Sequence, residues 1–379
     1  MTKHLDSLQI KNFRMLEDFT VERLGQVNLI VGKNNSGKST VLEALRIYAG
    51  RADYNLLEEL AKFHGEPCQV VRKEYNKLTI LPFQSFFSGR ELVHNKKIEI
   101  GCQGKGVLEI AYKGEFFYPD ELKNNFPNVG AAEAQSFLCD YLQVTRSIDN
   151  SGAATIIFMS NEWAINVLDQ NVLQHSWPKS RIESILNLNF VPTQLAQLLE
   201  LATRWDLIVF TDFESIITQA LQIIEPKIQG LAFVQDASKN TGERTAIVRL
   251  KGQSQPVPLK SLGDGMQRIL QIALNIYSAK DGLLLIDEFE NGLHYSVQEK
   301  VWGLIFEMAQ RLNIQVFATT HSRDCIEAFS KVANDRADVE GLLFRMGRSA
   351  KASDEGKIIA TIFDEARLDR MTQSDMEIR

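Results

Sequence analysis

Few cysteines are present in this sequence, and no two of them are close neighbours. Four occur among the 379 residues, namely Cys68, Cys102, Cys139 and Cys325. Because no CxxC pair is present, the common cysteine-based zinc and redox motifs are excluded. Four reduced thiols are typical of a protein of the cytosol, so we expect a cytoplasmic location.

Long hydrophobic runs are also missing. A helix that crosses a membrane needs roughly 18 or more consecutive apolar residues, and no such run occurs. The N-terminal stretch MTKHLDSLQIKNF lacks the apolar core of a secretion signal. We therefore expect no membrane span and no membrane partner.

Excess positive charge is absent as well. The chain has 42 lysines and arginines against 48 aspartates and glutamates, a net charge of −6. This balance excludes a general electrostatic attraction to nucleic acid, although a local basic patch stays possible. No stretch keeps an apolar heptad pattern over three or four heptads, so no long coiled coil is expected.

What is present is an ordinary globular composition with 44% hydrophobic residues. A length prior of about 100–200 residues per domain predicts two domains, or one large domain with an insertion. Strands and helices alternate at both ends of the chain. We expect strands at 19–24, 27–31, 245–250, 282–286, 314–319 and 341–346, and helices at 41–48, 266–278, 296–312, 322–332 and in the tail 364–379.

The middle of the chain is less regular. We expect a hairpin of 97–101 with 107–112, a strand at 154–159, and helices at 192–203 and 215–224. The fold class predicted is α/β, with a mixed sheet and an inserted α-helical lobe. Residues 1–50 and 255–379 would form the core, and residues 51–254 an antiparallel β subdomain and the helical lobe.

A glycine-rich loop follows the apolar run at 27–31 and precedes an amphipathic helix. Residues 32–39 fit the pattern G-x-x-x-x-G-K-[ST], with a threonine next. Such a loop points its N–H groups at phosphate oxygens, and the following helix adds partial positive charge. Lys38 should reach the β- and γ-phosphates of ATP, and the Ser39 hydroxyl should bind Mg²⁺. The predicted nucleotide-binding residues are Gly32, Asn34, Asn35, Ser36, Gly37, Lys38, Ser39 and Thr40.

Two adjacent carboxylates end the apolar run at 282–286. Asp287 at a strand tip can help to hold Mg²⁺. Glu288 can then polarise a water molecule aimed at the γ-phosphate. Many P-loop kinases keep only one acid here, so the second acid favours hydrolysis over phosphoryl transfer to another acceptor.

Three further segments come in the order found in ABC-type ATPases. Residues 261–266, SLGDGM, resemble the ABC signature, although Leu262 and Asp264 depart from the common Leu-Ser-Gly-Gly-Gln. Residues 290–294 look like the D-loop, and His321 looks like the switch histidine. With the opening residues 10–14, IKNFR, the chain most resembles bacterial AAA-labelled, ABC-like ATPases related to the OLD and SMC-like families.

This resemblance implies a head-to-tail dimer with two ATP molecules at its interface. One subunit would supply the phosphate loop and the acidic pair, with His321 at the γ-phosphate beside Glu288. The other subunit would supply Ser261, Gly263 and Gly265 in trans, and the departures in the signature leave those contacts open. Water would be excluded from the closed interface.

Two other residues keep two interpretations, and a third keeps one. Gln84 is a candidate for the family's Q-loop glutamine near the metal, or an ordinary loop residue. Arg14 could approach the nucleotide or form a salt bridge. His294 we expect to be structural.

Several biological roles stay open. OLD nucleases carry a further TOPRIM domain with an Asp-x-Asp pair, and no Asp-x-Asp occurs here, so we expect no nuclease activity in this chain. Many relatives belong to antiphage defence systems and work with a separate effector protein. The alternatives are a DNA repair ATPase that binds DNA itself, or a nucleotide-gated scaffold with little turnover.

Overall fold

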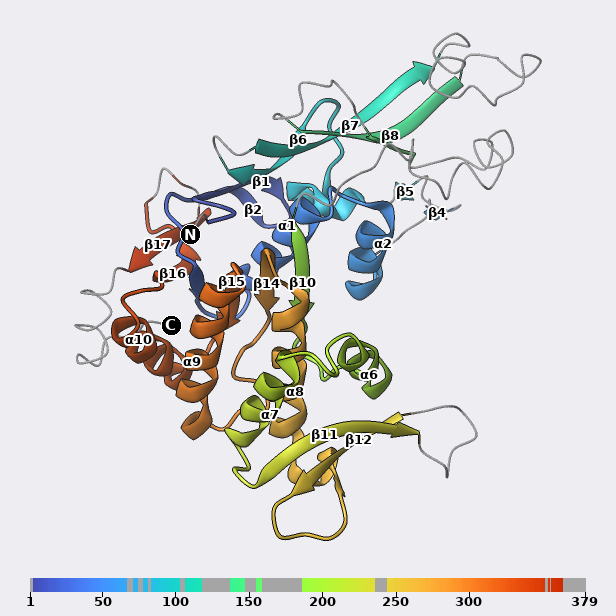
Figure 1. Ribbon diagram of the computed structural model, residues 1–379. Helices are drawn as coiled ribbons and strands as arrows, with labels where there is room; N and C mark the ends of the chain where they lie inside the picture. The colour runs from blue at the N-terminus through green and yellow to red at the C-terminus, as the bar shows by residue number, and fades with distance from the viewer. Residues whose placement is uncertain are drawn as a thin grey trace.

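The computed structural model describes residues 3–66, 71–73, 78–80, 83–102, 106–117, 137–146, 155–158, 186–235, 244–351, 354 and 356–363. Two six-stranded sheets organise these residues (Figure 1). The predicted helix at 364–379 lies outside the described residues.

The central sheet is parallel except at one edge. Its strand order is β10-β14-β15-β3-β16-β17, and only β17 is antiparallel to its neighbour. The strands are β3 (Val27–Val31), β10 (Asn187–Val191), β14 (Gly282–Ile286), β15 (Gln315–Thr320), β16 (Gly341–Arg348) and β17 (Ile358–Phe363). Every residue of β3, β14 and β15 is buried, as expected for strands covered on both faces. The α/β class and the mixed sheet predicted from the sequence are confirmed.

Strand β10 was not predicted. It pairs in parallel with β14, from Asn187 opposite Gly282 to Val191 opposite Ile286. The approach is close, because a Cβ added to Gly282 would lie 1.9 Å from the carbonyl oxygen of Asn187. A strand from within residues 51–254 therefore belongs to the core sheet, and the proposed division of the chain there remains a prediction.

The second sheet is antiparallel, and its strands come from two separate parts of the first half of the chain, residues 8–21 and residues 97–158. Its order is β2-β1-β6-β7-β8-β9. The strands are β1 (Leu8–Phe13), β2 (Leu16–Val21), β6 (Lys97–Cys102), β7 (Gly106–Phe117), β8 (Phe137–Arg146) and β9 (Thr155–Phe158). The predicted hairpin is confirmed, since β6 pairs with β7. The strand predicted at 19–24 begins earlier, because Phe13 pairs with Leu16 across a two-residue turn in which Arg14 has φ 51°.

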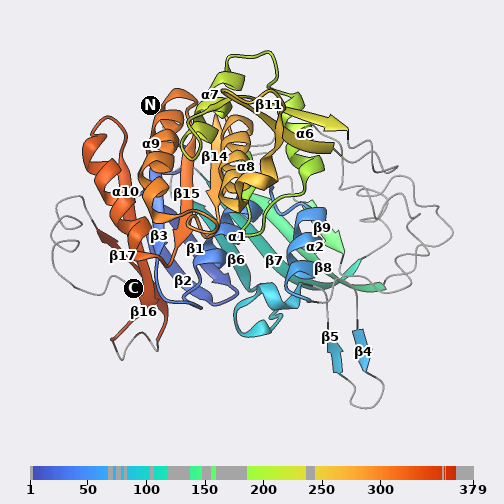
Figure 2. The ribbon, with the colours of Figure 1, turned by 90° about the horizontal axis from the view of Figure 1, so that it is seen from below.

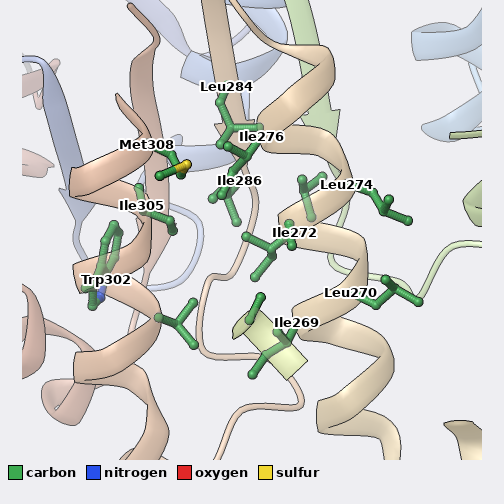
Figure 3. Close-up of a cluster of buried hydrophobic side chains, with 14 of the residues drawn as sticks. Ile269, Leu270, Ile272, Leu274, Ile276, Leu284, Ile286, Trp302, Ile305 and Met308 are labelled. Atoms are coloured by element: carbon green, nitrogen blue, oxygen red, sulfur yellow. The ribbon is translucent and has the colours of Figure 1, made fainter. Parts of the chain in front are cut away.

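Helices cover both faces of the central sheet. They are α1 (Lys38–Ala49), α8 (Asp264–Ser278), α9 (Tyr295–Arg311) and α10 (Arg323–Asp335). Helix α1 and the antiparallel sheet share one core with Leu283 and Leu285, whereas α8 and α9 share the other with Leu284 and Ile286 (Figure 3). This division follows from strand alternation, which sends successive side chains to opposite faces. Helices α9 and α10 run side by side (Figure 2).

A smaller lobe packs on α8. It contains α6 (Leu198–Asp206), α7 (Phe213–Gln222), β11 (Ile228–Gln235), β12 (Arg244–Leu250), β13 (Val257–Pro258) and the 3-10 turn η3 (Leu259–Leu262). The helix predicted at 192–203 begins only at Leu198. The residues before it form a bent, non-helical segment whose carbonyls are bound by side chains of α8: Arg268 binds Pro192, Gln271 binds Gln194, and Gln267 binds Ala196.

The remaining described elements are short. They are α2 (Tyr54–Phe63), β4 (Val71–Lys73), β5 (Leu78–Ile80), η1 (Gln84–Phe86) and η2 (Ser88–Arg90). Helix α2 was not predicted. Its N-cap is Asp53, whose side chain accepts hydrogen bonds from the backbone N–H groups of Asn55 and Leu56.

Candidate nucleotide site

The phosphate loop connects β3 to α1, the context that its motif requires. Gly37 has φ 91°, in the left-handed region that favours glycine, and as the N-cap it has no side chain to bind the first-turn N–H groups of α1. A Cβ on Gly32 would lie 2.7 Å from the Ser36 hydroxyl and 2.5 Å from the Met346 carbonyl. The loop is thus tightly curled, with helix N–H groups left for an anion.

Lys38 lies across this loop. Its ammonium donates to the carbonyl oxygens of Gly32 at 2.8 Å and Lys33 at 3.0 Å. Burial lowers the pKa of Lys38, while the carboxylates of Glu288, Glu290 and Asp287 act in the opposite direction. Asn34 and Asn35 are exposed at the loop tip, and Thr40 follows in α1.

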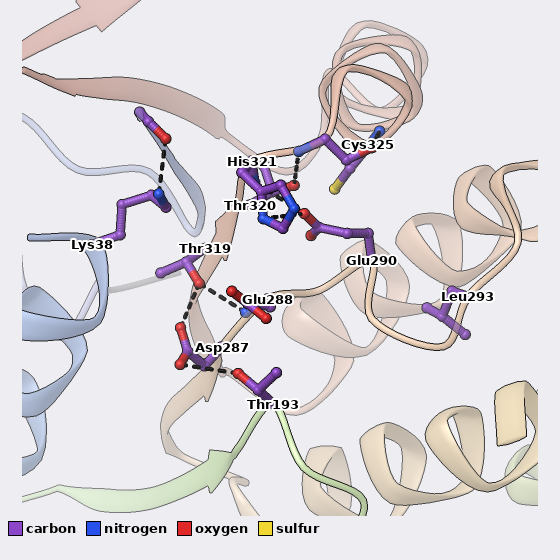
Figure 4. A network of polar contacts seen from close by, with 12 residues as sticks. Lys38, Thr193, Asp287, Glu288, Glu290, Leu293, Thr319, Thr320, His321 and Cys325 are labelled. Atoms are coloured by element: carbon purple, nitrogen blue, oxygen red, sulfur yellow. Dashed lines mark hydrogen bonds and ion pairs between the residues drawn. The ribbon is translucent and has the colours of Figure 1, made fainter. Parts of the chain in front are cut away.

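Asp287, at the end of β14, has three hydroxyl groups around its carboxylate, and Figure 4 shows those of Thr319 and Thr193. The Ser39 hydroxyl lies 3.2 and 3.4 Å from its two carboxylate oxygens. Thr319 donates to one oxygen at 2.7 Å, and Thr193 to the other at 3.2 Å. The chain therefore folds so that Ser39 and Asp287 touch, although 248 positions separate them.

The site offers the donors that Mg²⁺ prefers. Ser39 and Asp287 present oxygen atoms side by side, and the buried Ser36 hydroxyl of the phosphate loop lacks a hydrogen-bond partner among the described residues. Within that same part of the chain, no cluster of three or more His, Cys, Asp or Glu side chains could hold a metal by itself. Mg²⁺ commonly binds through one or two protein groups together with phosphates and water, so this donor set fits it.

Glu288 sits in an unusual backbone conformation. Its φ is 45°, rare for a residue with a side chain. Its N–H donates to the Thr319 hydroxyl at 2.8 Å, and the N–H of Phe289 donates to the Thr319 carbonyl at 2.9 Å. In the described part of the chain, no hydrogen bond or ion pair occupies the Glu288 carboxylate. The acid is thus held by its backbone with its carboxylate available.

Arg268 was missed by sequence reasoning. It is completely buried on α8, and its guanidinium donates to the carbonyls of Asp287 at 2.8 Å, Glu288 at 3.1 Å and Pro192 at 2.5 Å. Burial lowers its pKa to about 10, against the raising effect of Asp287, Glu290 and Glu288. The available signal was an arginine among the apolar positions of helix 266–278.

His321 follows β15 and faces an acid. Its Nδ1 lies 3.1 Å from the Oε1 of Glu290, and its backbone N–H donates to the same oxygen at 3.0 Å. The His321 side chain is 50% exposed and that of Glu290 only 11%. His294 instead caps α9 by accepting from the N–H of Ser296, the structural role we predicted.

The signature-like segment lies at the start of α8, beside β12, β13 and η3. Ser261 is exposed and donates to the Pro258 carbonyl at 2.6 Å. Gly263 is exposed with φ 98° and forms the N-cap of α8. Gly265 packs on the D-loop-like segment, since a Cβ there would lie 2.8 Å from the Gly292 carbonyl. These contacts join the segment to its own subunit, and any contact in trans stays a prediction.

Arg14 and Gln84 each bind a group outside residues 32–40. Arg14 lies in an ion-pair cluster, with Nε 2.8 Å from Glu43 and Nη1 2.9 Å from Glu66. Of the two interpretations predicted for Arg14, the structure shows the salt bridge, and this salt bridge is largely buried. The amide of Gln84 donates to the Arg90 carbonyl at 2.7 Å, and its predicted role near the metal stays a prediction.

Two family models match this chain. Residues 4–151 match a model described as "AAA ATPase domain". Residues 165–324 match one described as "AAA domain, putative AbiEii toxin, Type IV TA system". The chain is an ATP-hydrolysing P-loop enzyme. Its α/β fold is that of a P-loop NTPase.

Two similar proteins match this ATPase over different lengths of the chain. An "ATP/GTP phosphatase" of Helicobacter pylori is 23% identical over 354 residues, covering 88% of this chain and 89% of that protein. The "DNA replication and repair protein RecF" of Clostridioides difficile is 32% identical, over 20% of this chain and 22% of its own length.

Among solved structures, an SMC head domain bound to the C-winged helix domain of ScpA matches with a TM-score of 0.49 and 13% identity, covering 95% of this chain and 98% of the other. The SMC head domain of Thermotoga maritima matches with a TM-score of 0.42 and 11% identity, over 96% and 100%. None of the helices in the described residues has the length and apolar character needed to cross a bilayer.

Proposed function

We propose that ATP binds with its β- and γ-phosphates in the loop at residues 32–40, between Lys38 and the acidic pair. The observation that carries this assignment is the contact of Ser39 with Asp287, which brings the loop and the end of β14 to one point. Ser39 and Asp287 would hold Mg²⁺, and Lys38 would exchange its two loop carbonyls for phosphate oxygens. Bound Mg²⁺ would neutralise charge on the phosphates.

Glu288 acts as the general base in this proposal. Its carboxylate accepts a proton from a water molecule as the water oxygen bonds to the γ-phosphorus. The bond from the γ-phosphorus to the bridging oxygen breaks, and ADP and phosphate result. Thr319 and Arg268 hold the backbone at Glu288, so the base is placed before the substrate arrives. His321 contacts the γ-phosphate from the same side.

ATP binding and hydrolysis would drive head-to-tail dimerisation or a conformational switch, with bound ATP closing the dimer and hydrolysis releasing it. In the proposed dimer Ser261, Gly263 and Gly265 of one subunit complete the ATP site of the other. Exposure of the first two at the N-terminus of α8 is consistent with this role. The proposed partners are a second copy of this chain and a separate effector protein, and the proposed setting is antiphage defence. The model that matches residues 165–324 names a putative toxin of a type IV TA system, and it names neither an effector nor a phage.

A second candidate is a DNA repair or recombination ATPase that binds DNA directly. The similarity to RecF over 81 residues favours it. Stimulation of ATP hydrolysis by DNA would support this candidate, and co-purification of a toxin-like protein would support the effector role. A scaffold with little turnover is the third possibility, and it predicts that Glu288→Gln changes nothing beyond ATP binding.

Two variants test the site. Lys38→Ala should abolish binding of a fluorescent ATP analogue, whereas the exposed Lys280→Ala should bind as the wild type does. Glu288→Gln should bind ATP but lower kcat by about 100-fold or more, since a general base contributes that much. We expect this variant to accumulate as an ATP-dependent dimer in size-exclusion chromatography with light scattering. Wild-type turnover by Glu288→Gln would refute the assigned base.

A further inference from the structure

Glu290 is a largely buried carboxylate in the site to which the reaction above assigns no task. It lies two residues beyond Glu288, in the loop that leaves β14. Phe289 anchors this loop, because its ring stacks on Trp302 with centroids 4.0 Å apart and planes at 14°. The loop backbone is also tied to Thr319 at the end of β15. The Glu290 carboxylate is therefore carried on a fixed support.

One carboxylate oxygen of Glu290 makes two contacts with the same residue. Its Oε1 accepts from the backbone N–H of His321 at 3.0 Å and lies 3.1 Å from the ring Nδ1 (Figure 4). The first contact places the backbone at the end of β15, and the second sets the rotation of the ring. The other oxygen, Oε2, is buried without a hydrogen-bond partner among the described residues. The carboxylate is thus committed to His321 rather than shared among several donors.

We propose that Glu290 is the positioning residue for His321. An Nδ1–H that donates to the carboxylate leaves Nε2 as the ring nitrogen that meets the γ-phosphate. When Nε2–H donates to that phosphate, the ring carries both protons and Glu290 supplies the balancing negative charge. The inference rests on the proposed function, because it requires His321 to act at the γ-phosphate.

Glutamine at position 290 is the informative replacement. Its amide has nearly the shape of the carboxylate and can still accept the backbone N–H of His321. It has no charge to balance a doubly protonated ring, and it can present either an acceptor or a donor to Nδ1. Glu290→Gln should therefore preserve the fold while loosening the choice of ring orientation.

The test is a double-mutant cycle in the full-length chain, with kcat and KM for ATP measured for Glu290→Gln, His321→Ala and both together. We expect kcat to fall about 10- to 100-fold in each single variant, with KM little changed, because misplacement of a catalytic group costs up to that much. The double variant should be no slower than His321→Ala. Glu327→Gln, an exposed acid paired with Arg323 on α10, is the control and should keep wild-type kcat.

The outcomes separate the two proposals. An equal loss from Glu290→Gln with and without His321 would overturn the positioning role and leave the assignment of His321 standing. Wild-type kcat in Glu290→Gln would do the same. Unchanged kcat in His321→Ala would refute the role of His321 in the proposed function, and this inference with it.

A second measurement keeps the inference testable if Glu290→Gln does not fold. The ¹⁵N shifts of His321 in the wild-type chain with a non-hydrolysable ATP analogue report which ring nitrogen carries a proton. Comparison with His321→Ala assigns its signals among the six histidines. We expect a protonated Nδ1, and an unprotonated Nδ1 would overturn the positioning role.

Discussion

Replacing Arg268 with methionine removes a buried guanidinium while keeping most of the length of the side chain. The guanidinium holds three carbonyl groups, those of Pro192, Asp287 and Glu288. A buried carbonyl that loses its donor costs about 1–3 kcal/mol. All three residues are partly exposed, so water can replace part of the lost bonding.

The methionine variant also avoids the burial of a charge, which offsets part of the loss. We therefore expect the free energy of unfolding to fall by about 2–4 kcal/mol, a large value for one substitution. We also expect kcat to fall, because the carbonyl of Glu288 loses the Arg268 donor and keeps the N–H of Asn291 at 3.0 Å, so that its backbone, at φ 45°, can relax.

Urea unfolding followed by circular dichroism measures the first effect, and phosphate release measures the second. Arg323→Met is the matched control, since this arginine is 55% exposed and pairs with Glu327 across one turn of α10. It should change the unfolding free energy by less than about 0.5 kcal/mol. If Arg268→Met unfolds at the wild-type urea concentration and keeps its kcat, the reasoning about this buried cation is refuted.

Gly282→Ala should destabilise the chain by about 1–3 kcal/mol, because the added Cβ would lie 1.9 Å from the backbone of β10. Gly303→Ala in α9, with open space around it, should lose no stability. Equal melting temperatures for these two variants would contradict the close approach of β10 to Gly282. Asp287→Asn should raise the Mg²⁺ concentration for half-maximal ATPase activity about 10-fold or more, and an unchanged Mg²⁺ titration would remove Asp287 from the metal site. The hydrogen bond from Arg244 lowers the pKa of Asp206 below its ordinary 3.8, so this pair stabilises the fold above that pH and stops doing so as the pH falls through the lowered value. The melting temperatures of wild type and Arg244→Met should differ slightly at pH 7, and the gap should narrow as the pH falls below 3.8 to what the contacts of Arg244 with Phe233 contribute. A gap that widens in acid would reverse the assigned sign.

Local patterns were enough for the elements that each form a recognisable unit. The phosphate loop, the buried strand at 282–286 and the helix at 266–278 could be predicted because glycine spacing, an apolar run and helical periodicity are properties of neighbouring residues. Strand β10 shows the opposite case. Its five residues, NLNFV, carry no decisive periodicity, and they form a strand because β14 offers a free edge with Gly282 allowing close approach.

The sequence by itself determined which residues are candidates for phosphate, metal and base chemistry, because that prediction depends on residue type and on spacing within a single loop. Only the tertiary structure decided that Ser39 reaches Asp287, that Arg268 holds the carbonyl of Glu288, and that Glu290 faces His321. Those contacts join residues on separate elements, and parallel strands bring them together by placing their carboxyl ends at one edge of the sheet. Their partners follow from strand order, which no local pattern encodes.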